Sequence, residues 1–252
     1  MCIRDRFHEL RDYRRGDAMR QIDWRATARN RRLISRSYQE ERDQRVVFML
    51  DCGRRMRSAE AGQLSHFDEA LNAVLLLAYM ALRQGDSVAI GTFGVASESR
   101  ARWLGPIKGA GRVSEILNML YDLEPSTEMP DYKRATTELL SRHRKHSLVV
   151  VVTNLRGEDA QDVLPALRIL NKKHSVLVAS MSESSLGVAA GADIAGFDDA
   201  LRAAGAHHLL AARERVLRAI RSDGVMALDT TPAGLSAELV NAYLTLKSAG
   251  SL

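Results

Sequence analysis

The sequence predicts an α/β fold in which a mainly parallel, doubly wound β-sheet has helices on both faces. The run Val46–Leu50 contains five consecutive apolar residues, and Leu148–Val152 repeats this pattern farther along the chain. A half-buried strand would alternate polar and apolar residues, so these runs indicate strands buried on both faces. Stretches with helical character separate the predicted strands, which favours crossover connections and parallel pairing.

Length and composition are those of a globular domain with an extension. The chain has 252 residues, of which 46% are hydrophobic and 27% charged, enough to build a substantial core. The longest apolar run, Ala73–Leu82, is too short to cross a bilayer and keeps helical periodicity. Cys2 and Cys52 lack metal-ligand spacing and are interpreted as reduced thiols, which favours a cytoplasmic location.

The beginning of the chain is interpreted in three parts. Residues 1–6 lack the apolar core of a signal peptide and are similar to a translated sequencing adapter, so we expect a non-native remnant without a role in the fold. The native protein would then extend farther upstream. Residues 7–44 form an arginine-rich extension, in which Ala18–Asn30 is helix-compatible and Leu33–Gln39 is a candidate strand. Residues 45–252 form the main domain.

Capping and periodicity predict the remaining elements in order. Ser65 is expected to cap a helix with one apolar face, and Gly85 is expected to end it. The further predicted strands are Ser87–Phe93, Ala101–Leu104, His146–Asn154, Ser175–Met181 and Val225–Asp229. The further predicted helices are Val113–Leu123, Tyr132–Arg144, Val163–Lys173, Phe197–Ser222 with an interruption near Gly205, and Ser236–Ser248. Gly187–Gly196 is predicted to be an exposed loop.

The net charge of +5 is concentrated near the start of the chain. Residues 1–45 contain thirteen arginines, no lysine and eight acidic residues, so the remainder is neutral. Arginine pairs well with carboxylates and phosphates, and one interpretation is therefore an anionic partner. The other interpretation is that the interspersed acids pair with these arginines at a domain surface.

The extension also carries a long, spaced pattern that resembles the signature of the bacterial family called "domain of unknown function 58". The matching residues are Leu10, Arg11, Asp12, Tyr13, Gly16, Asp17, Arg20, Ile22, Asp23, Trp24, Thr27, Ala28 and Arg29. Further matches are Leu50, Asp51, Gly53, Arg54 and Met56, and, in the last helix, Glu238, Leu239, Val240, Tyr243 and Leu246. The resemblance implies a domain similar to the von Willebrand factor A fold. Members often have membrane-spanning helices upstream and are often paired with MoxR-type AAA+ ATPases.

The von Willebrand A fold implies a divalent-cation position at the carboxyl edge of the sheet, built from an Asp-x-Ser-x-Ser loop, a threonine and a second aspartate. Asp51 fills the first position, Gly53 and Arg55 replace the two serines, Asn154 replaces the second aspartate, and Thr127 is the candidate threonine. Mg²⁺ needs several hard oxygen ligands, and Arg54 and Arg55 bring positive charge close to its position. We therefore expect no cofactor, with Asp51 and Thr127 as the remaining candidate ligands of Mg²⁺.

Without a metal, Asp51 has two structural interpretations. Arg54 or Arg55 pairs with its carboxylate and fixes the loop, or Asp51 caps the turn by accepting hydrogen bonds from backbone amides. In both cases Asp51, Gly53, Arg54, Arg55 and Asn154 form a recognition loop and not a catalytic site.

A second candidate site consists of the signature residues Tyr13, Gly16, Asp17, Arg20, Asp23, Trp24, Thr27 and Arg29. Helical spacing places Arg20, Asp23 and Thr27 on one face. This face either docks a partner or an anion, or it forms an Arg–Asp network that clamps the extension to the main domain. Ile22 and Trp24 of this segment are expected to pack against the main domain.

Catalytic signatures are weak. His207 and His208 have no acid or cysteine at ligand spacing, and Ser35 and Ser37 lack the Gly-x-Ser-x-Gly elbow. Gly105–Gly111 places glycines before a helix but lacks the Gly-Lys-Ser/Thr ending of a phosphate-binding loop.

The sequence therefore predicts a non-enzymatic protein-interaction scaffold with a degenerate metal site, which the family resemblance links to a MoxR-type AAA+ ATPase. The alternative is binding of nucleic acid or an anionic membrane surface through the arginine-rich extension, with nucleic acid the less favoured. A hydrolase is disfavoured because no nucleophile is paired with a base. We expect this part of the protein to be cytoplasmic, with any anchor to the inner membrane in upstream segments.

Overall fold

The computed structural model describes residues 5–14, 19, 22–40, 44–59, 62–95, 97 and 100–249. The chain forms two units, Met1–Asp43 and Gln44–Leu252. In the first unit, β1 (Asp5–Asp12) pairs antiparallel with β2 (Ile34–Glu40), and the short helix α1 (Trp24–Asn30) lies between them in the sequence. Asp5 and Arg6 belong to β1, and the interpretation of residues 1–6 as a non-native remnant stays a prediction.

The second unit is built on a sheet with the strand order β5-β4-β3-β6-β7-β8 among the described residues. These strands are β3 (Arg45–Asp51), β4 (Ser87–Phe93), β5 (Trp103–Lys108), β6 (Leu148–Thr153), β7 (Ser175–Met181) and β8 (Met226–Thr230). Neighbouring strands are parallel except β4 and β5, which are antiparallel. The predicted mainly parallel sheet is confirmed.

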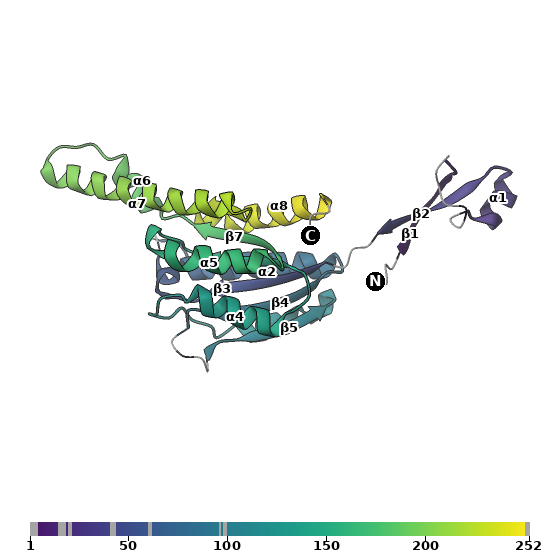
Figure 1. The fold of residues 1–252 in the computed structure, drawn as a ribbon, viewed down its shortest axis with the longest axis horizontal. Helices are drawn as coiled ribbons and strands as arrows, with labels where there is room; N and C mark the ends of the chain where they lie inside the picture. The colour runs from purple at the N-terminus through teal and green to yellow at the C-terminus, as the bar shows by residue number, and fades with distance from the viewer. Residues whose placement is uncertain are drawn as a thin grey trace. The chain divides into compact units, whose positions relative to one another are not determined.

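Helices cover both faces of this sheet (Figure 1). One face is covered by α2 (His66–Arg83), α3 (Val113–Leu120) and α8 (Leu235–Ser248), the other by α4 (Tyr132–Arg142), α5 (Ala160–Asn171) and α7 (Phe197–Ser222). The short helix α6 (Ser184–Ala190) precedes α7 and packs against it. No helix in the described part of the chain combines the length and apolar composition needed to cross a membrane.

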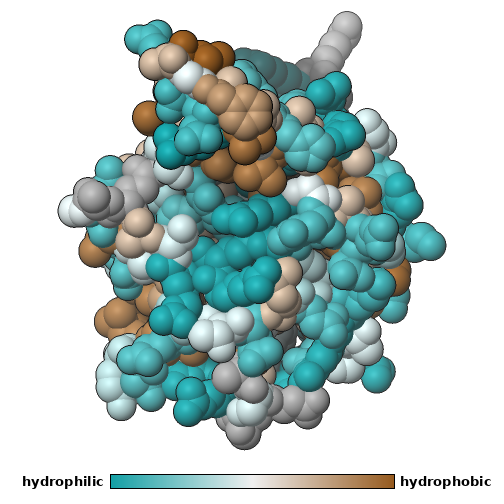
Figure 2. Space-filling model, turned by 90° about the vertical axis from the view of Figure 1, so that its left-hand side faces the viewer, coloured by the Kyte–Doolittle hydropathy of each residue, from teal (hydrophilic) through white to brown (hydrophobic). Residues whose placement is uncertain are grey.

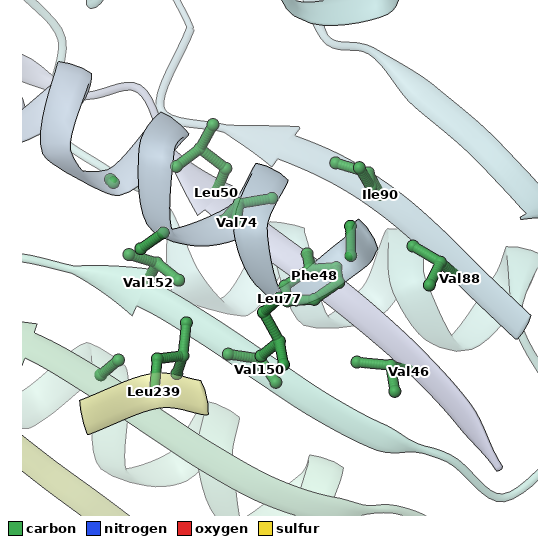
Figure 3. Close-up of a cluster of buried hydrophobic side chains, with 14 of the residues drawn as sticks. Val46, Phe48, Leu50, Val74, Leu77, Val88, Ile90, Val150, Val152 and Leu239 are labelled. Atoms are coloured by element: carbon green, nitrogen blue, oxygen red, sulfur yellow. The ribbon is translucent and has the colours of Figure 1, made fainter. Parts of the chain in front are cut away.

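The central strand β3 shows why the predicted apolar runs are uninterrupted. Val46, Phe48 and Leu50 point towards the α2 and α8 side, where Leu77 and Leu239 cover them (Figure 3). Val47 and Met49 belong to the cluster on the opposite face, which includes residues of α4, α5 and α7. Both faces are thus buried, and each buried large side chain contributes about 1.5–3 kcal/mol of transfer free energy.

Several local predictions are confirmed. The Ser65 hydroxyl accepts a hydrogen bond from the Asp68 amide at 3.1 Å and caps α2. Gly85 follows the end of this helix with φ at +86°, a conformation that glycine adopts without strain. The strands β4 and β7 have the predicted bounds.

Three predictions made from glycine and proline positions are wrong. The strand expected at Ala101–Leu104 is instead Trp103–Lys108, because Pro106 is tolerated in a strand at the edge of the sheet. The first residues of the candidate phosphate-binding loop Gly105–Gly111 therefore belong to this strand. The helix α7 continues through the exposed Gly205, whose cost in a helix is only about 1 kcal/mol. Gly187 lies in α6, so the exposed loop is confined to residues 191–196.

Three histidines cluster near the amino ends of β6 and β7. The ring centroid of His174 lies 6.1 Å from that of His143 and 6.4 Å from that of His146. His174 is buried, and neither of its ring nitrogens has a hydrogen-bond partner within the described part of the chain. Burial, together with the nearby His143, His146 and Lys173, lowers the pKa of His174 to about 4.

We predict that protonation of His174 destabilises the fold in acid. The pKa in the folded state is about 4 and the ordinary value is 6.5, so the folded state binds fewer protons and stability is lost as the pH falls from 6.5 to 4. His174→Phe should remove on the order of 2 kcal/mol of this loss. Urea unfolding at about pH 7.5 and about pH 4.5 measures it. The exposed His146→Phe is the control, and an unchanged acid loss in His174→Phe would contradict the prediction.

Candidate functional site

The carboxyl edge of the sheet contains a closed polar network that starts at Asp51, the last residue of β3. Asp51 is 1% exposed. Its Oδ1 accepts a hydrogen bond from the Gly53 amide at 2.7 Å, and its Oδ2 accepts one from the Thr153 hydroxyl at 2.6 Å. The Thr153 hydroxyl lies 2.9 Å from the hydroxyl of the buried Tyr132. Asp51 therefore caps the turn through a backbone amide, as one of the two interpretations predicted.

Burial controls the protonation of this carboxyl group. Removal from water raises the pKa of Asp51 to about 6, against the lowering effects of the Thr153 and Gly53 hydrogen bonds and of the Arg55 charge. Burial likewise raises the pKa of Tyr132 well above its ordinary value. A carboxyl group of this kind is costly to keep ionised at neutral pH.

Arg55 is the buried cation of the network, but it does not pair with Asp51. Its guanidinium group forms ion pairs with Asp159 and Glu158, which precede α5, and lies 3.4 Å from the Asn154 backbone oxygen. The side chain of Arg54 is exposed. The prediction that Arg54 or Arg55 pairs with the Asp51 carboxylate is therefore wrong, because two acids of another loop bind the buried guanidinium group instead.

Asn154 extends the network to two further elements. Its side-chain nitrogen lies 3.1 Å from His66 Nδ1 in α2 and donates to Glu183, next to α6, at 3.2 Å. Arg156 binds the same Glu183 carboxylate at 2.5 Å. The network thus connects the loops after β3, β6 and β7.

Backbone packing closes the loop around Asp51. A Cβ atom at Gly53 would lie 3.0 Å from Asp51 Oδ1, from the Glu128 backbone oxygen and from Pro130 Cδ. Gly94 has φ at +71°, and a Cβ there would lie 2.8 Å from the Gly53 nitrogen. A serine hydroxyl at position 53 has no space here. Thr127 is exposed on the segment between α3 and α4.

The structure brings together Asp51, Gly53, Arg55 and Asn154 of the predicted recognition loop, and leaves Arg54 at its surface. Sequence reasoning did not single out Thr153, Tyr132, Glu158 or Asp159. Thr153 could have been found from the sequence. It follows the second buried run, whose strand β6 pairs in parallel with β3, so Thr153 and Asp51 end neighbouring strands at the same edge. The partners of Arg55 lie more than a hundred residues away and have no sequence signal.

The signature segment in the first unit has local structural roles. Asp23 caps α1 by accepting a hydrogen bond from the Ala26 amide at 3.0 Å. The Thr27 hydroxyl accepts one from the Ile34 amide at 3.0 Å and joins α1 to β2. The Tyr13 amide donates to the Leu33 carbonyl at 3.0 Å. Ile22 is buried, and Trp24 is 63% exposed. Arg29 is also exposed, and Gly16, Asp17 and Arg20 lie outside the described residues.

The tip of the α6–α7 hairpin is an exposed apolar surface that sequence reasoning missed. It consists of Val188, Ile194, Phe197 and Leu201, with exposed fractions between 62% and 81%. Figure 2 shows apolar side chains gathered at the top of this face of the molecule, above a hydrophilic centre. Asp193, Asp198 and Asp199 accompany them in the sequence. The four-residue spacing of Phe197 and Leu201 beside Asp198 and Asp199 was the available signal.

Comparisons with known proteins agree with this fold. The family model described as "Protein of unknown function DUF58" matches residues 9–219. The PilB minor pilin from Streptococcus sanguinis has a TM-score of 0.57 at 10% identity; the match covers 85% of this chain and 64% of the pilin. The hypothetical protein BatB from Bacteroides thetaiotaomicron has a TM-score of 0.50 at 14% identity, with 81% of this chain and 99% of BatB covered.

A von Willebrand factor type A structure from Catenulispora acidiphila matches with a TM-score of 0.45 at 10% identity, over 83% of this chain and 42% of that chain. No curated protein sequence matches the chain.

We predict that Asp51→Asn removes a pH-dependent contribution to stability. The folded-state pKa of about 6 exceeds the ordinary 3.8, so the wild type gains stability as the pH falls through this range. The asparagine oxygen can still accept from the Gly53 amide. The unfolding free energy of the variant relative to wild type should therefore fall by about 2 kcal/mol between about pH 7.5 and about pH 4.5. Urea titrations at both pH values measure the difference, and a constant difference would refute the assignment.

Proposed function

The chain belongs to the family described as protein of unknown function DUF58, and we propose that it is a non-enzymatic protein-interaction scaffold whose carboxyl edge recognises a partner. The observation that carries this proposal is the apolar tip of the α6–α7 hairpin, formed by Val188, Ile194, Phe197 and Leu201. Contiguous exposed apolar side chains with a polar surround are typical of protein-binding surfaces. Phe197 and Leu201 are the candidate anchors.

The closed network supports a rigid platform for this tip. Glu183 precedes α6 and is bound by Asn154 and Arg156, so the base of the hairpin is tied to the loop after β6. Thr153 and Tyr132, the side chains next to Asp51, are buried and therefore closed to a substrate. These contacts favour recognition over catalysis.

The residues present do not fit the Mg²⁺ of the von Willebrand A fold. Both oxygens of Asp51 accept hydrogen bonds from the protein, and position 53 has no space for a serine hydroxyl. Asn154 uses its side-chain nitrogen to donate, and Arg55 places a buried guanidinium group beside the site. Octahedral coordination by hard oxygen atoms would require several of these contacts to be broken. The proposed scaffold therefore works with a degenerate metal site.

The proposed partner is a MoxR-type AAA+ ATPase. Family resemblance supports this choice, and the hairpin tip defines the chemistry that the partner must have. A complementary surface would present an apolar pocket for Phe197 and Leu201 and a basic rim for Asp193, Asp198 and Asp199.

We predict that Phe197→Asp combined with Leu201→Asp prevents retention of the ATPase. Both side chains are mostly exposed, 81% and 62%, so the variant should fold normally. Loss of two apolar anchors should reduce retention at least about tenfold. The measurement is affinity isolation of full-length protein from cell extract, with the ATPase identified and quantified by mass spectrometry.

The matched control for this experiment is Leu76→Asp combined with Ile169→Asp. These residues are exposed apolar positions on α2 and α5. The control should retain the ATPase at the wild-type level. The proposal fails if the wild type retains no such ATPase, or if the hairpin and control variants lose it equally.

We also predict that Mg²⁺ produces no saturable increase in the melting temperature of the wild type relative to EDTA. A metal that binds the folded state would raise this temperature in a concentration-dependent manner. Asp51→Asn serves as the matched variant, since it should respond to Mg²⁺ in the same way as wild type. A saturable increase that Asp51→Asn abolishes would show that the metal site works.

A further inference from the structure

Positive charge is concentrated at the amino edge of the sheet, although the net charge summed over this part of the sequence does not reveal it. It is formed by the described segments 44–45, 83–87, 108–115, 142–147, 168–175 and 221–225 and by Lys247 at the end of α8. These segments contain twelve Lys and Arg residues and three acids. Because residues 46–252 have no net charge, the rest of the second unit carries a compensating excess of acids. The unit is therefore electrically polarised along its strands.

The three acids of this amino-edge surface are each in an ion pair with one of its own basic residues. Asp86 binds Lys247 at 2.7 Å, Asp223 binds Arg168 at 2.7 Å and Glu115 binds Arg112 at 2.5 Å. The surface thus has nine more positive than negative charges, and none of its acids is left to balance them.

Helix dipoles account for only part of this excess. Five helices place a basic residue in the last turn, where it interacts favourably with the carboxyl end of the helix: Arg83, Arg142, Arg168, Arg221 and Lys247. Arg144, Lys145 and Lys173 lie beyond the helix ends in the connections to β6 and β7, and Lys172 is the C-cap residue of α5; all four side chains are exposed.

The histidine cluster shows that these two connections lie side by side. His143 and His146 flank Arg144 and Lys145, and the centroids of both histidine rings lie within 6.4 Å of the His174 ring, next to Lys172 and Lys173. Four exposed, long basic side chains therefore lie in one small area. Gln44, where the arginine-rich first unit joins the second, is at the same edge of the sheet.

We propose that this amino-edge surface, centred on Arg144, Lys145, Lys172 and Lys173, docks onto an anionic phospholipid bilayer. Clusters of about four to eight Lys and Arg residues are typical of segments that bind anionic membrane surfaces, so these four suffice for reversible attachment. Docking at the amino edge leaves the hairpin tip at the carboxyl edge free for a protein partner. This surface is distinct from the arginine-rich extension.

The geometry favours a bilayer over a nucleic acid. Nucleic-acid interfaces usually insert a helix or strand into a groove, or stack bases on aromatic side chains. Here α2, α4, α5, α7 and α8 all end at this surface, so it presents loops and helix ends and not a helix or strand that could enter a groove. Basic side chains on loops reach beyond these helix ends and suit diffuse contact with lipid headgroups.

The test uses the full chain and sedimentation with vesicles of phosphatidylcholine that contain about 30% phosphatidylglycerol. The variant combines Arg144→Gln, Lys145→Gln, Lys172→Gln and Lys173→Gln. A control with the same net charge combines Arg54→Gln, Arg57→Gln, Arg202→Gln and Arg215→Gln, all exposed elsewhere on the second unit. Both retain the arginine-rich first unit, and melting temperatures verify that both are folded.

The expected result is salt-sensitive binding of wild type to these vesicles and not to pure phosphatidylcholine, with at least about a tenfold loss of partition coefficient in the amino-edge variant. The control and the Phe197→Asp, Leu201→Asp variant should bind within about twofold of wild type. The proposal is overturned if wild type does not bind, if the variant binds like wild type, or if variant and control lose binding equally. Tighter binding to duplex DNA, lost in the same amino-edge variant, would assign the surface to nucleic acid instead.

Discussion

The buried guanidinium group of Arg55 is the constraint on which the carboxyl edge depends. An unpaired buried charge would cost several kcal/mol, so the fold must bring acids to it. Asp159 and Glu158 supply them, and the Asn154 backbone oxygen lies within reach. These contacts hold the loop after β3 against the loop after β6. Asp51 is left in the same enclosed space with neutral hydrogen-bond donors, which explains why its pKa rises although an arginine is nearby.

Sequence patterns predicted the sheet because its physical cause is local. Val46–Leu50 and Leu148–Val152 are apolar on both faces, and Ser65 and Gly85 carry their capping chemistry in the residues themselves. For the polar network at the carboxyl edge, the sequence predicted where Asp51 lies but not which side chains contact it. Asp51 lies at the expected strand end, but its partner Thr153 and the acids around Arg55 come from a distant segment. Spacing within one loop contains no information about which acid will meet a buried arginine.

Charge was misinterpreted for a related reason. Counting residues places the excess charge in residues 1–45 and assigns none to the remainder. The parallel topology separates the charges of that neutral remainder, because α2, α4, α5 and α7, each of which leads into a parallel strand, return from the carboxyl to the amino edge. Acids favour the starts of these helices and bases their ends, as Asp198, Asp199 and Arg221 of α7 illustrate. Basic loops such as Arg144–Lys145 add to the same edge. A chain can therefore be neutral in total and strongly polarised in its fold.

In the proposed scaffold, an internal ion network stands where a metal-dependent fold would hold a cation, and this changes how recognition would be controlled. In a metal-dependent face, a carboxylate from the partner can complete the coordination of the cation, so binding depends on the ion. Arg55 cannot bind a carboxylate of the partner in this way, because its buried guanidinium group already forms ion pairs with acids of the same chain. The proposal therefore assigns affinity to groups that remain exposed, above all Phe197 and Leu201. Recognition of this kind would not depend on an ion, and its regulation would come from the partner or from where the protein is held.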